Sequence, residues 1–227
     1  MSGENELQRR WMQPVFRRIL ARRFIGTGFL AGMTALAGCH STNPSPVVVS
    51  GDITKNEDFA RSETARAFDL IQQRKFTEAE PALKRALEAD PTYGPAHNDL
   101  GLVYYRMNRP YDAAWELEKA IKLMPRQPEP HTNLGLVLEK SGKLNDALGE
   151  FTLATQMDRD SPEYPEYLGN LARVRLRLGL RDDETRRVFE SLVKNETRPQ
   201  WLEWARLTLI RLKSESPEIS PSTAPAD

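Results

Sequence analysis

Small and apolar residues recur at a fixed spacing through the middle of the chain. Shifting the sequence by 34 residues superposes His97, Leu100, Gly101, Leu102, Val103, Ala113 and Ala120 on His131, Leu134, Gly135, Leu136, Val137, Ala147 and Ala154. One step upstream, the same columns contain Ala67, Leu70, Ala79, Leu83 and Ala86. Apolar positions three and four residues apart indicate amphipathic helices. The pattern therefore predicts about three successive helical hairpins between residues 60 and 160.

The helical pattern continues beyond residue 160 but loses its strict period. Two apolar stripes lie on either side of Gly179, and a third follows Pro199. Their residues are Tyr164, Leu168, Leu171, Val174 and Leu178, then Val188 and Leu192, then Leu202, Ala205, Leu209 and Leu212. The first two stripes predict a degenerate fourth hairpin. The third predicts a helix that caps the array, as terminal repeats require, with Trp201 and Trp204 in its core rather than in a partner-binding hot spot.

Glycine and alanine occupy the positions where the two helices of a hairpin are expected to touch. Glycine inside a helix costs about 1 kcal/mol relative to alanine, so Gly101 and Gly135 indicate a close approach of two helices. Leu117 and Phe151 have the size to fill the space opposite them. The predicted packing residues are Ala67, Ala79, Ala86, Gly101, Ala113, Ala120, Gly135, Ala147 and Ala154.

Turn signals separate the predicted helices. Thr77 and Glu80 have the spacing of a capping box, which predicts that Thr77 opens a second helix. Pro110 suits the first turn of the next second helix, and Gly142 marks the third hairpin. The helix boundaries are therefore expected near these residues.

The spacing and the residues of these columns resemble the tetratricopeptide repeat. Its signature is a Leu-Gly pair, an aromatic residue, two alanines around a bulky residue and a closing proline, the last matched by Pro91 and Pro125. The resemblance covers about residues 60–160. It implies an all-α superhelical solenoid of about three regular hairpins, a degenerate fourth hairpin and a C-terminal capping helix.

The resemblance also implies a groove for a protein or peptide partner, lined by the first helix of each hairpin. The corresponding positions are Phe68, Leu102 and Leu136, with Ile71, Tyr105 and Glu139 next to them. The family's carboxylate clamp is absent, because Thr64, Asn98 and Thr132 stand where its cationic positions begin. We therefore expect an amphipathic or apolar segment rather than a free carboxylate. The alternative is that these residues belong to the core or are covered by the C-terminal helix.

The N-terminal segment predicts an export signal and a lipid anchor. An arginine-rich stretch up to Arg23 precedes fifteen uncharged residues and then Cys39, the layout of a signal peptide. The uncharged run is shorter than the roughly 20 apolar residues of a membrane-spanning helix. Its end, residues 36–39 (LAGC), resembles the bacterial lipobox. This implies that Cys39 receives palmitate-type acyl chains and becomes the mature N-terminus, with Met1 and Met12 both open as translation starts.

These patterns divide the chain into segments. We predict a lipoprotein signal peptide over 1–38, a lipid anchor and flexible tether over 39–58, a helical repeat domain over 59–213 and a disordered tail over 214–227. His40 follows Cys39, where aspartate favours inner-membrane retention in enterobacteria. The expected location is therefore the outer membrane, facing the periplasm, in an organism that has one.

Composition and charge exclude several classes of function. Lysine plus arginine equals aspartate plus glutamate at 32 each, which removes the electrostatic signature of a nucleic-acid binder. The histidines at positions 40, 97 and 131 form no metal-ligand spacing, and no glycine-rich phosphate loop is present. We expect no catalysis, cofactor, metal or small-molecule substrate. His97 and His131 share a column, and helix packing is preferred over a two-histidine metal site.

A run of arginines in the fourth hairpin is the remaining charge feature. Arg173, Arg175, Arg177 and Arg181 are followed by acidic residues at 182–184. A solvated face with balanced charge is the preferred interpretation, and a surface for anionic lipid or an acidic partner is the alternative.

Together these observations predict a lipid-anchored scaffold or adaptor in the bacterial cell envelope. Its partner is an unidentified protein or peptide held in the concave groove. Two alternatives stay open: a pilotin-like lipoprotein that assists secretin or type IV pilus assembly, and an accessory subunit of a cell-wall enzyme.

Overall fold

The computed structural model describes residues 55–215, which form nine α-helices and no strand within that range. Four hairpins follow one another: α3 (Glu57–Gln72) with α4 (Phe76–Ala89), α5 (Gly94–Arg106) with α6 (Pro110–Leu123), α7 (Pro128–Lys140) with α8 (Leu144–Met157), and α9 (Tyr164–Arg177) with α10 (Asp183–Asn195). The last helix is α11 (Pro199–Ser214). This confirms the predicted array of hairpins with a final helix. Cys39, the predicted signal peptide, and residues 39–54 and 216–227 lie outside the described residues.

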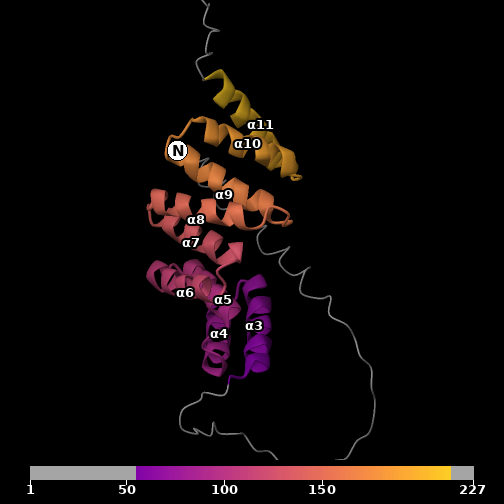
Figure 1. Cartoon of the computed structure of the whole chain (residues 1–227). Helices are drawn as coiled ribbons and strands as arrows, with labels where there is room; N and C mark the ends of the chain where they lie inside the picture. The colour runs from indigo at the N-terminus through magenta and orange to yellow at the C-terminus, as the bar shows by residue number, and fades with distance from the viewer. Residues whose placement is uncertain (1–54, 216–227) are drawn as a thin grey trace, which may run out of the picture.

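The hairpins stack in chain order into one elongated array, from α3 and α4 at one end to α11 at the other (Figure 1). The first helices form a continuous row, because α3 contacts α5, α5 contacts α7 and α7 contacts α9. The second helices α4, α6 and α8 each contact the first helix that follows. Among the helices described, none is long and apolar enough to cross a membrane.

Close approach of the two helices explains the glycine inside α5 and the one inside α7. A Cβ atom built on Gly101 would lie 2.6 Å from Leu117 Cγ and 3.1 Å from the Ala113 carbonyl oxygen. The equivalent atom on Gly135 would lie 2.6 Å from the Phe151 ring. The alanines of the predicted packing set are all fully buried. Leu117 of α6 and Phe151 of α8 thus occupy the space that the two glycines leave.

Each of the four hairpin turns contains one residue in the left-handed backbone conformation. Arg74, Asn108, Gly142 and Gly179 each have a φ between 61° and 80°. At the first turn, the Lys75 N–H donates to the Leu70 carbonyl at 2.9 Å, which closes the end of the helix in a Schellman arrangement. Three of the four positions recur every 34 residues. Asparagine and glycine tolerate this conformation, whereas Arg74 adopts it at a steric cost.

Two of the predicted helix starts can be compared with the structure. Pro110 occupies the first turn of α6, as predicted. The capping box at Thr77 is wrong: α4 begins at Phe76, its N-cap is Lys75, and no side chain caps it. The hydrogen bond from the Lys75 N–H to the Leu70 carbonyl closes the preceding turn at Lys75. Helix α4 therefore begins at Phe76, and Thr77 lies inside it.

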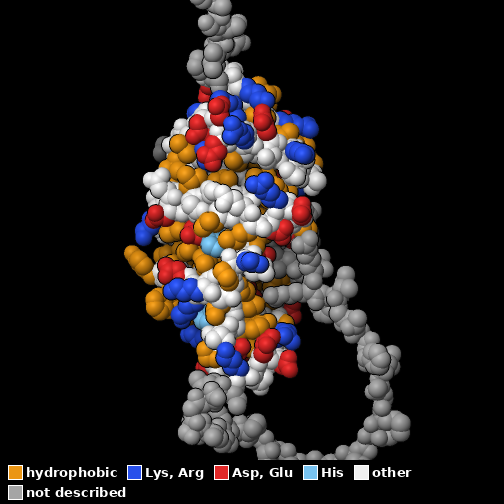
Figure 2. Space-filling model, in the orientation of Figure 1, with side chains coloured by type: hydrophobic (Ala, Val, Ile, Leu, Met, Phe, Trp, Pro, Cys, Tyr) orange, Lys and Arg blue, Asp and Glu red, His pale blue; other side chains and the backbone are white. Residues whose placement is uncertain are grey.

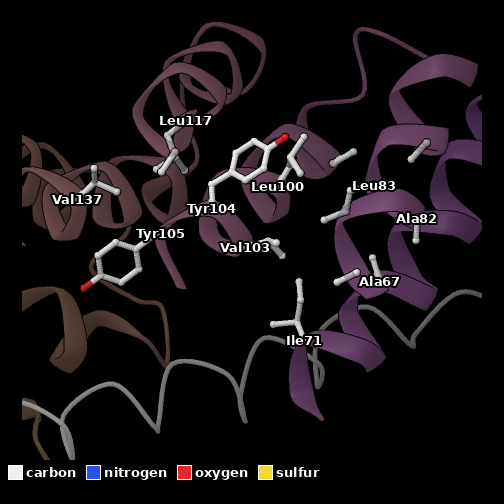
Figure 3. Packing of buried hydrophobic residues seen from close by; sticks show 14 of the residues in the cluster. Ala67, Ile71, Ala82, Leu83, Leu100, Val103, Tyr104, Tyr105, Leu117 and Val137 are labelled. Carbon is white, nitrogen blue, oxygen red and sulfur yellow. The ribbon is translucent and has the colours of Figure 1, made fainter. Parts of the chain in front are cut away.

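Buried side chains between the layers form two clusters. The first extends over α3 to α7, where Leu100 and Val103 of α5 point toward Leu83 of α4 and Ile71 of α3 (Figure 3). The second extends from α8 to α11 around Phe151, Phe189 and Leu192. Leu136 and Leu138 of α7 pack against both clusters, so the array has a continuous apolar interior.

Candidate functional site: a pocket along the first helices

A pocket of about 400 Å³ lies along the row of first helices. Residues of α3, α5, α7 and α9 line it, together with residues of the α6–α7 and α8–α9 connections. Its apolar lining consists of Phe68, Ile71, Pro95, Leu102, Met124 and Pro130. Its acidic lining consists of Asp99, Glu129, Asp158, Glu163 and Glu166. The volume is in the range of ligand-binding pockets.

The structure brings three of the six predicted groove residues into this pocket. Phe68, Ile71 and Leu102 line it, and all three come from α3 and α5. Leu136 is partly buried between the two core clusters. Tyr105 and Glu139 are buried, at 5% and 7% exposure, and are not in the lining.

Glu139 of α7 is held by two arginines of α9. Arg173 donates from Nε to Oε1 at 3.0 Å and from Nη2 to Oε2 at 2.6 Å, and Arg177 donates from Nη1 to Oε1 at 2.8 Å. Burial raises the pKa of Glu139, but the hydrogen bonds and charge of the arginines outweigh it and leave the pKa below its usual value. This cluster ties the third hairpin to the fourth.

The run of arginines at 173, 175, 177 and 181 was predicted to be a solvated face with balanced charge, and only part of it is solvent-exposed. Arg175 is 3% exposed and donates to Thr185 and to the Asp182 carboxylate, while Glu184 lies 3.0 Å from it. The Thr185 backbone N–H, the Thr185 hydroxyl and Arg175 lower the pKa of Asp182 to about 2. The acidic residues after the run balance Arg175, whereas Arg173 and Arg177 turn to α7.

His97 and His131 make equivalent contacts in successive hairpins. His97 Nδ1 pairs with Glu116 Oε2 at 2.6 Å, and His131 Nδ1 pairs with Glu150 Oε2 at 2.7 Å. Each pair joins the first helix to the second helix of its own hairpin. Within residues 55–215, no group of three or more potential metal ligands occurs.

The acidic end of the pocket surrounds Tyr167 of α9. Tyr167 lines the pocket but is only 3% exposed. Burial raises its pKa strongly, and the negative charge of Glu129 and Glu163 raises it further. Sequence reasoning missed this end, because Asp158, Ser161 and Glu163 belong to a connection that lies outside the repeat columns.

The C-terminal helix does not contribute to the described lining of the pocket. It packs on α10, where Trp204 contacts Phe189 with ring centroids 5.1 Å apart. Trp201 lies against Gly169 of α9. The alternative that α11 covers the apolar end of the pocket is therefore not supported by its position.

A second apolar surface lies on the outside of the array. Hydrophobic side chains protrude over α6 (Figure 2), where Tyr111 is 89% exposed and Trp115 is 62% exposed. Neither residue lines the pocket.

Comparisons with known proteins agree with this architecture. Residues 70–132 match a family model described as tetratricopeptide repeat. No curated protein matches the sequence. A structure of pilF from Pseudomonas aeruginosa superposes with a TM-score of 0.64 at 24% identity, over 71% of this chain and 72% of that one.

Two shorter structures are also similar in fold. The first tetratricopeptide domain of Spaghetti (RPAP3), bound to the HSP90 peptide SRMEEVD, gives a TM-score of 0.52 at 16% identity, over 56% of this chain and 99% of that one. The type III secretion translocator chaperone SycD of Yersinia enterocolitica gives 0.50 at 19% identity, over 53% and 95%. At these identities the likeness concerns the fold. The described chain thus folds as a tetratricopeptide-repeat superhelix, and its residues 70–132 match the tetratricopeptide-repeat family.

Proposed function

We propose that the protein is a lipid-anchored adaptor of the bacterial cell envelope that binds a segment of a partner protein in the pocket of its first helices. The observation that carries the proposal is the pocket itself, with Phe68, Ile71 and Leu102 at one end. Stacked repeats use extended concave surfaces of this kind to bind other proteins. Two of the structures similar in fold are a peptide complex and a chaperone.

Apolar contact supplies affinity in this proposal. Burying a leucine or phenylalanine side chain contributes about 1.5–3 kcal/mol, so a segment that covers Phe68 and Leu102 gains several such contacts. Its backbone or polar groups meet the amide of Asn98 and the other polar residues in the lining. An amphipathic helix or an extended segment with apolar residues on one side fits this arrangement.

Serine in place of Phe68 or Leu102 is expected to weaken partner binding about tenfold or more, because each change removes one apolar contact. The measurement is chemical cross-linking in intact cells followed by quantification of the adduct. Leu153→Ser is the matched control, since Leu153 is 42% exposed on α8 and does not line the pocket. Normal adduct from the Phe68 and Leu102 variants, at unchanged thermal midpoints, would remove the pocket from the proposal.

The lipid anchor at Cys39 is the second part of the proposal, and its support is the lipobox-like sequence alone. Cys39→Ser is expected to release the protein from the membrane fraction and to block processing, because the acyl chains can no longer be attached. One acyl chain anchors only marginally, whereas two or more anchor stably. Membrane retention with normal processing of the variant would contradict the anchor. The proposed location is the cell membrane, and in an organism that has an outer membrane it is that membrane, facing the periplasm.

A pilotin-like role and a role beside a cell-wall enzyme are narrower forms of the same adaptor proposal. In the first, the bound segment belongs to a secretin or pilus component, and in the second to the enzyme. The identity of the cross-linked partner distinguishes them. The peptide bound by Spaghetti is a poor guide, because SRMEEVD carries three acidic side chains and this pocket is lined by carboxylates.

A further inference from the structure

The C-terminal end of the array lacks the polar outer face that a terminal repeat needs. On α11, Leu207 is 57% exposed and Ile210 is 66% exposed, and the two lie three residues apart on one face of the helix. At the other end of the array (Figure 1), α3 exposes one large hydrophobic side chain, Phe59, and its exposed residues over 61–69 are polar apart from one alanine. The α11 end therefore has a pair of uncovered aliphatic side chains that the α3 end lacks.

Two arginines flank this aliphatic pair. Arg206 comes directly before Leu207 and Arg211 directly after Ile210, and both arginine side chains are exposed. Neither guanidinium forms an ion pair among the described residues. Glu203 is the single acidic residue of α11, which contains three basic residues. The outer face of α11 is therefore both apolar and cationic.

The exposed apolar surface on α6 differs from this one in charge. Tyr111 and Trp115 protrude from a helix that contains three acidic residues and two lysines. Its apolar side chains are thus accompanied by no excess of positive charge. The combination of uncovered aliphatic side chains and unpaired cations distinguishes α11.

A second copy of the chain fits the α11 surface poorly. Antiparallel two-fold pairing of α11 with its counterpart would set Leu207 against Ile210, and the same register would set Arg206 against Arg211. Juxtaposed like charges oppose such an interface. The surface requires an occupant that combines apolar groups with negative charge, and an anionic bilayer has both.

We infer that α11 docks on an anionic lipid bilayer, with Leu207 and Ile210 at the boundary between headgroups and acyl chains and Arg206 and Arg211 on the anionic headgroups. Aliphatic burial and charge attraction act together in such interfacial helices. The inference rests on the proposed lipid anchor only for the nearness of the bilayer, because a tethered surface meets its target at a high effective concentration.

The test uses the anchored protein, purified and reconstituted in vesicles of phosphatidylglycerol and phosphatidylethanolamine. The chain has one cysteine, the proposed lipid site, so Leu207→Cys supplies a single free thiol for an environment-sensitive fluorophore. That fluorophore is expected to be quenched by nitroxide-labelled lipids and protected from aqueous iodide. The same fluorophore at Trp115→Cys on α6 is the matched control and is expected to show the reverse.

Charge attraction is tested in the Leu207→Cys protein. Arg206→Gln/Arg211→Gln is expected to lower the ratio of docked to undocked protein about tenfold, because each arginine near an anionic surface contributes to binding. Added salt and replacement of phosphatidylglycerol by phosphatidylcholine are expected to act in the same direction. Lys119→Gln/Lys122→Gln removes the same charge from α6 and is the matched control. Thermal midpoints of both double variants check folding.

Three results would overturn the inference and leave the proposed function standing. They are iodide access at position 207 equal to that at position 115, protection from iodide without quenching by the lipids, which means that a protein covers α11, and equal loss in the two double variants, which means that net charge is responsible. Protein that does not float with the vesicles would contradict the anchor instead. Quenching at position 207 in the Cys39→Ser form mixed with the same vesicles then decides the inference.

Discussion

Gly101→Val is expected to lower the free energy of unfolding by about 1–3 kcal/mol, the cost of forcing extra atoms into a packed interior. The added Cβ would lie 2.6 Å from Leu117 Cγ, which is a branch point rather than the end of a flexible side chain. It would also lie 3.1 Å from a backbone carbonyl oxygen of α6. For a domain of this size each kcal/mol lowers the thermal midpoint by about 2–4 °C. The measurement is thermal unfolding followed by circular dichroism.

Gly149→Val is the matched control for this change. Gly149 also lies inside a helix, α8, but nothing lies within 4 Å of a Cβ built on it. Its substitution is expected to change stability by no more than about 0.5 kcal/mol. If both variants unfold at the same temperature as the unmodified protein, the close contact of α5 and α6 is wrong.

Glu139→Gln is expected to lower stability by about 2–3 kcal/mol at neutral pH. Removing one partner of a buried ion pair costs about 3–5 kcal/mol, and the partial exposure of Arg177, at 38%, reduces that figure. The change removes the carboxylate charge that Arg173, whose side chain is only 16% exposed, contacts in the folded protein. The third and fourth hairpins are also expected to unfold in separate transitions in this variant, because this cluster joins α7 to α9.

The same variant has a defined pH dependence. Because the pKa of Glu139 is below its usual value in the folded protein, its contribution is fully present above the unfolded-state pKa of about 4.3 and is lost as the pH falls below it. Thermal midpoints of the variant and the unmodified protein are therefore expected to differ at pH 7 and to converge as the pH falls from the unfolded-state pKa through the lower folded-state pKa of Glu139. Glu118→Gln, at an exposed position of α6, serves as the control. A gap that does not narrow at all as the pH is lowered over the whole acid range in which the protein stays folded would show that the charge of Glu139 is not what stabilises the junction.

The repeat columns predicted the hairpins because each column records a packing requirement. A leucine at 117 requires a glycine at 101, since any larger residue at 101 would place its Cβ atom against the Leu117 side chain. The turn residues carried a similar signal, because asparagine or glycine at 108, 142 and 179 permits the left-handed conformation. Such local requirements leave traces in a single sequence.

Pairing across hairpins was harder to predict. Glu139 was assigned to the groove from its column, and the period of 34 places Arg173 in the next repeat of that same column. The two side chains meet because α7 and α9 are neighbours. A search for opposite charges one repeat apart would have found this pair. The acidic end of the pocket had no such signal, since Asp158, Ser161 and Glu163 lie in a connection whose path depends on the packing of α9.

The central claim is that the partner lies in the pocket of the first helices. A photo-reactive amino acid placed at Leu102 in the pocket, and in a second protein at the exposed Trp115 on α6, tests it most directly after irradiation of intact cells. The account predicts a discrete cross-linked partner from position 102, lost when Phe68 is also changed to serine, and none of that partner from position 115. The same partner captured from position 115 and not from position 102 would contradict it.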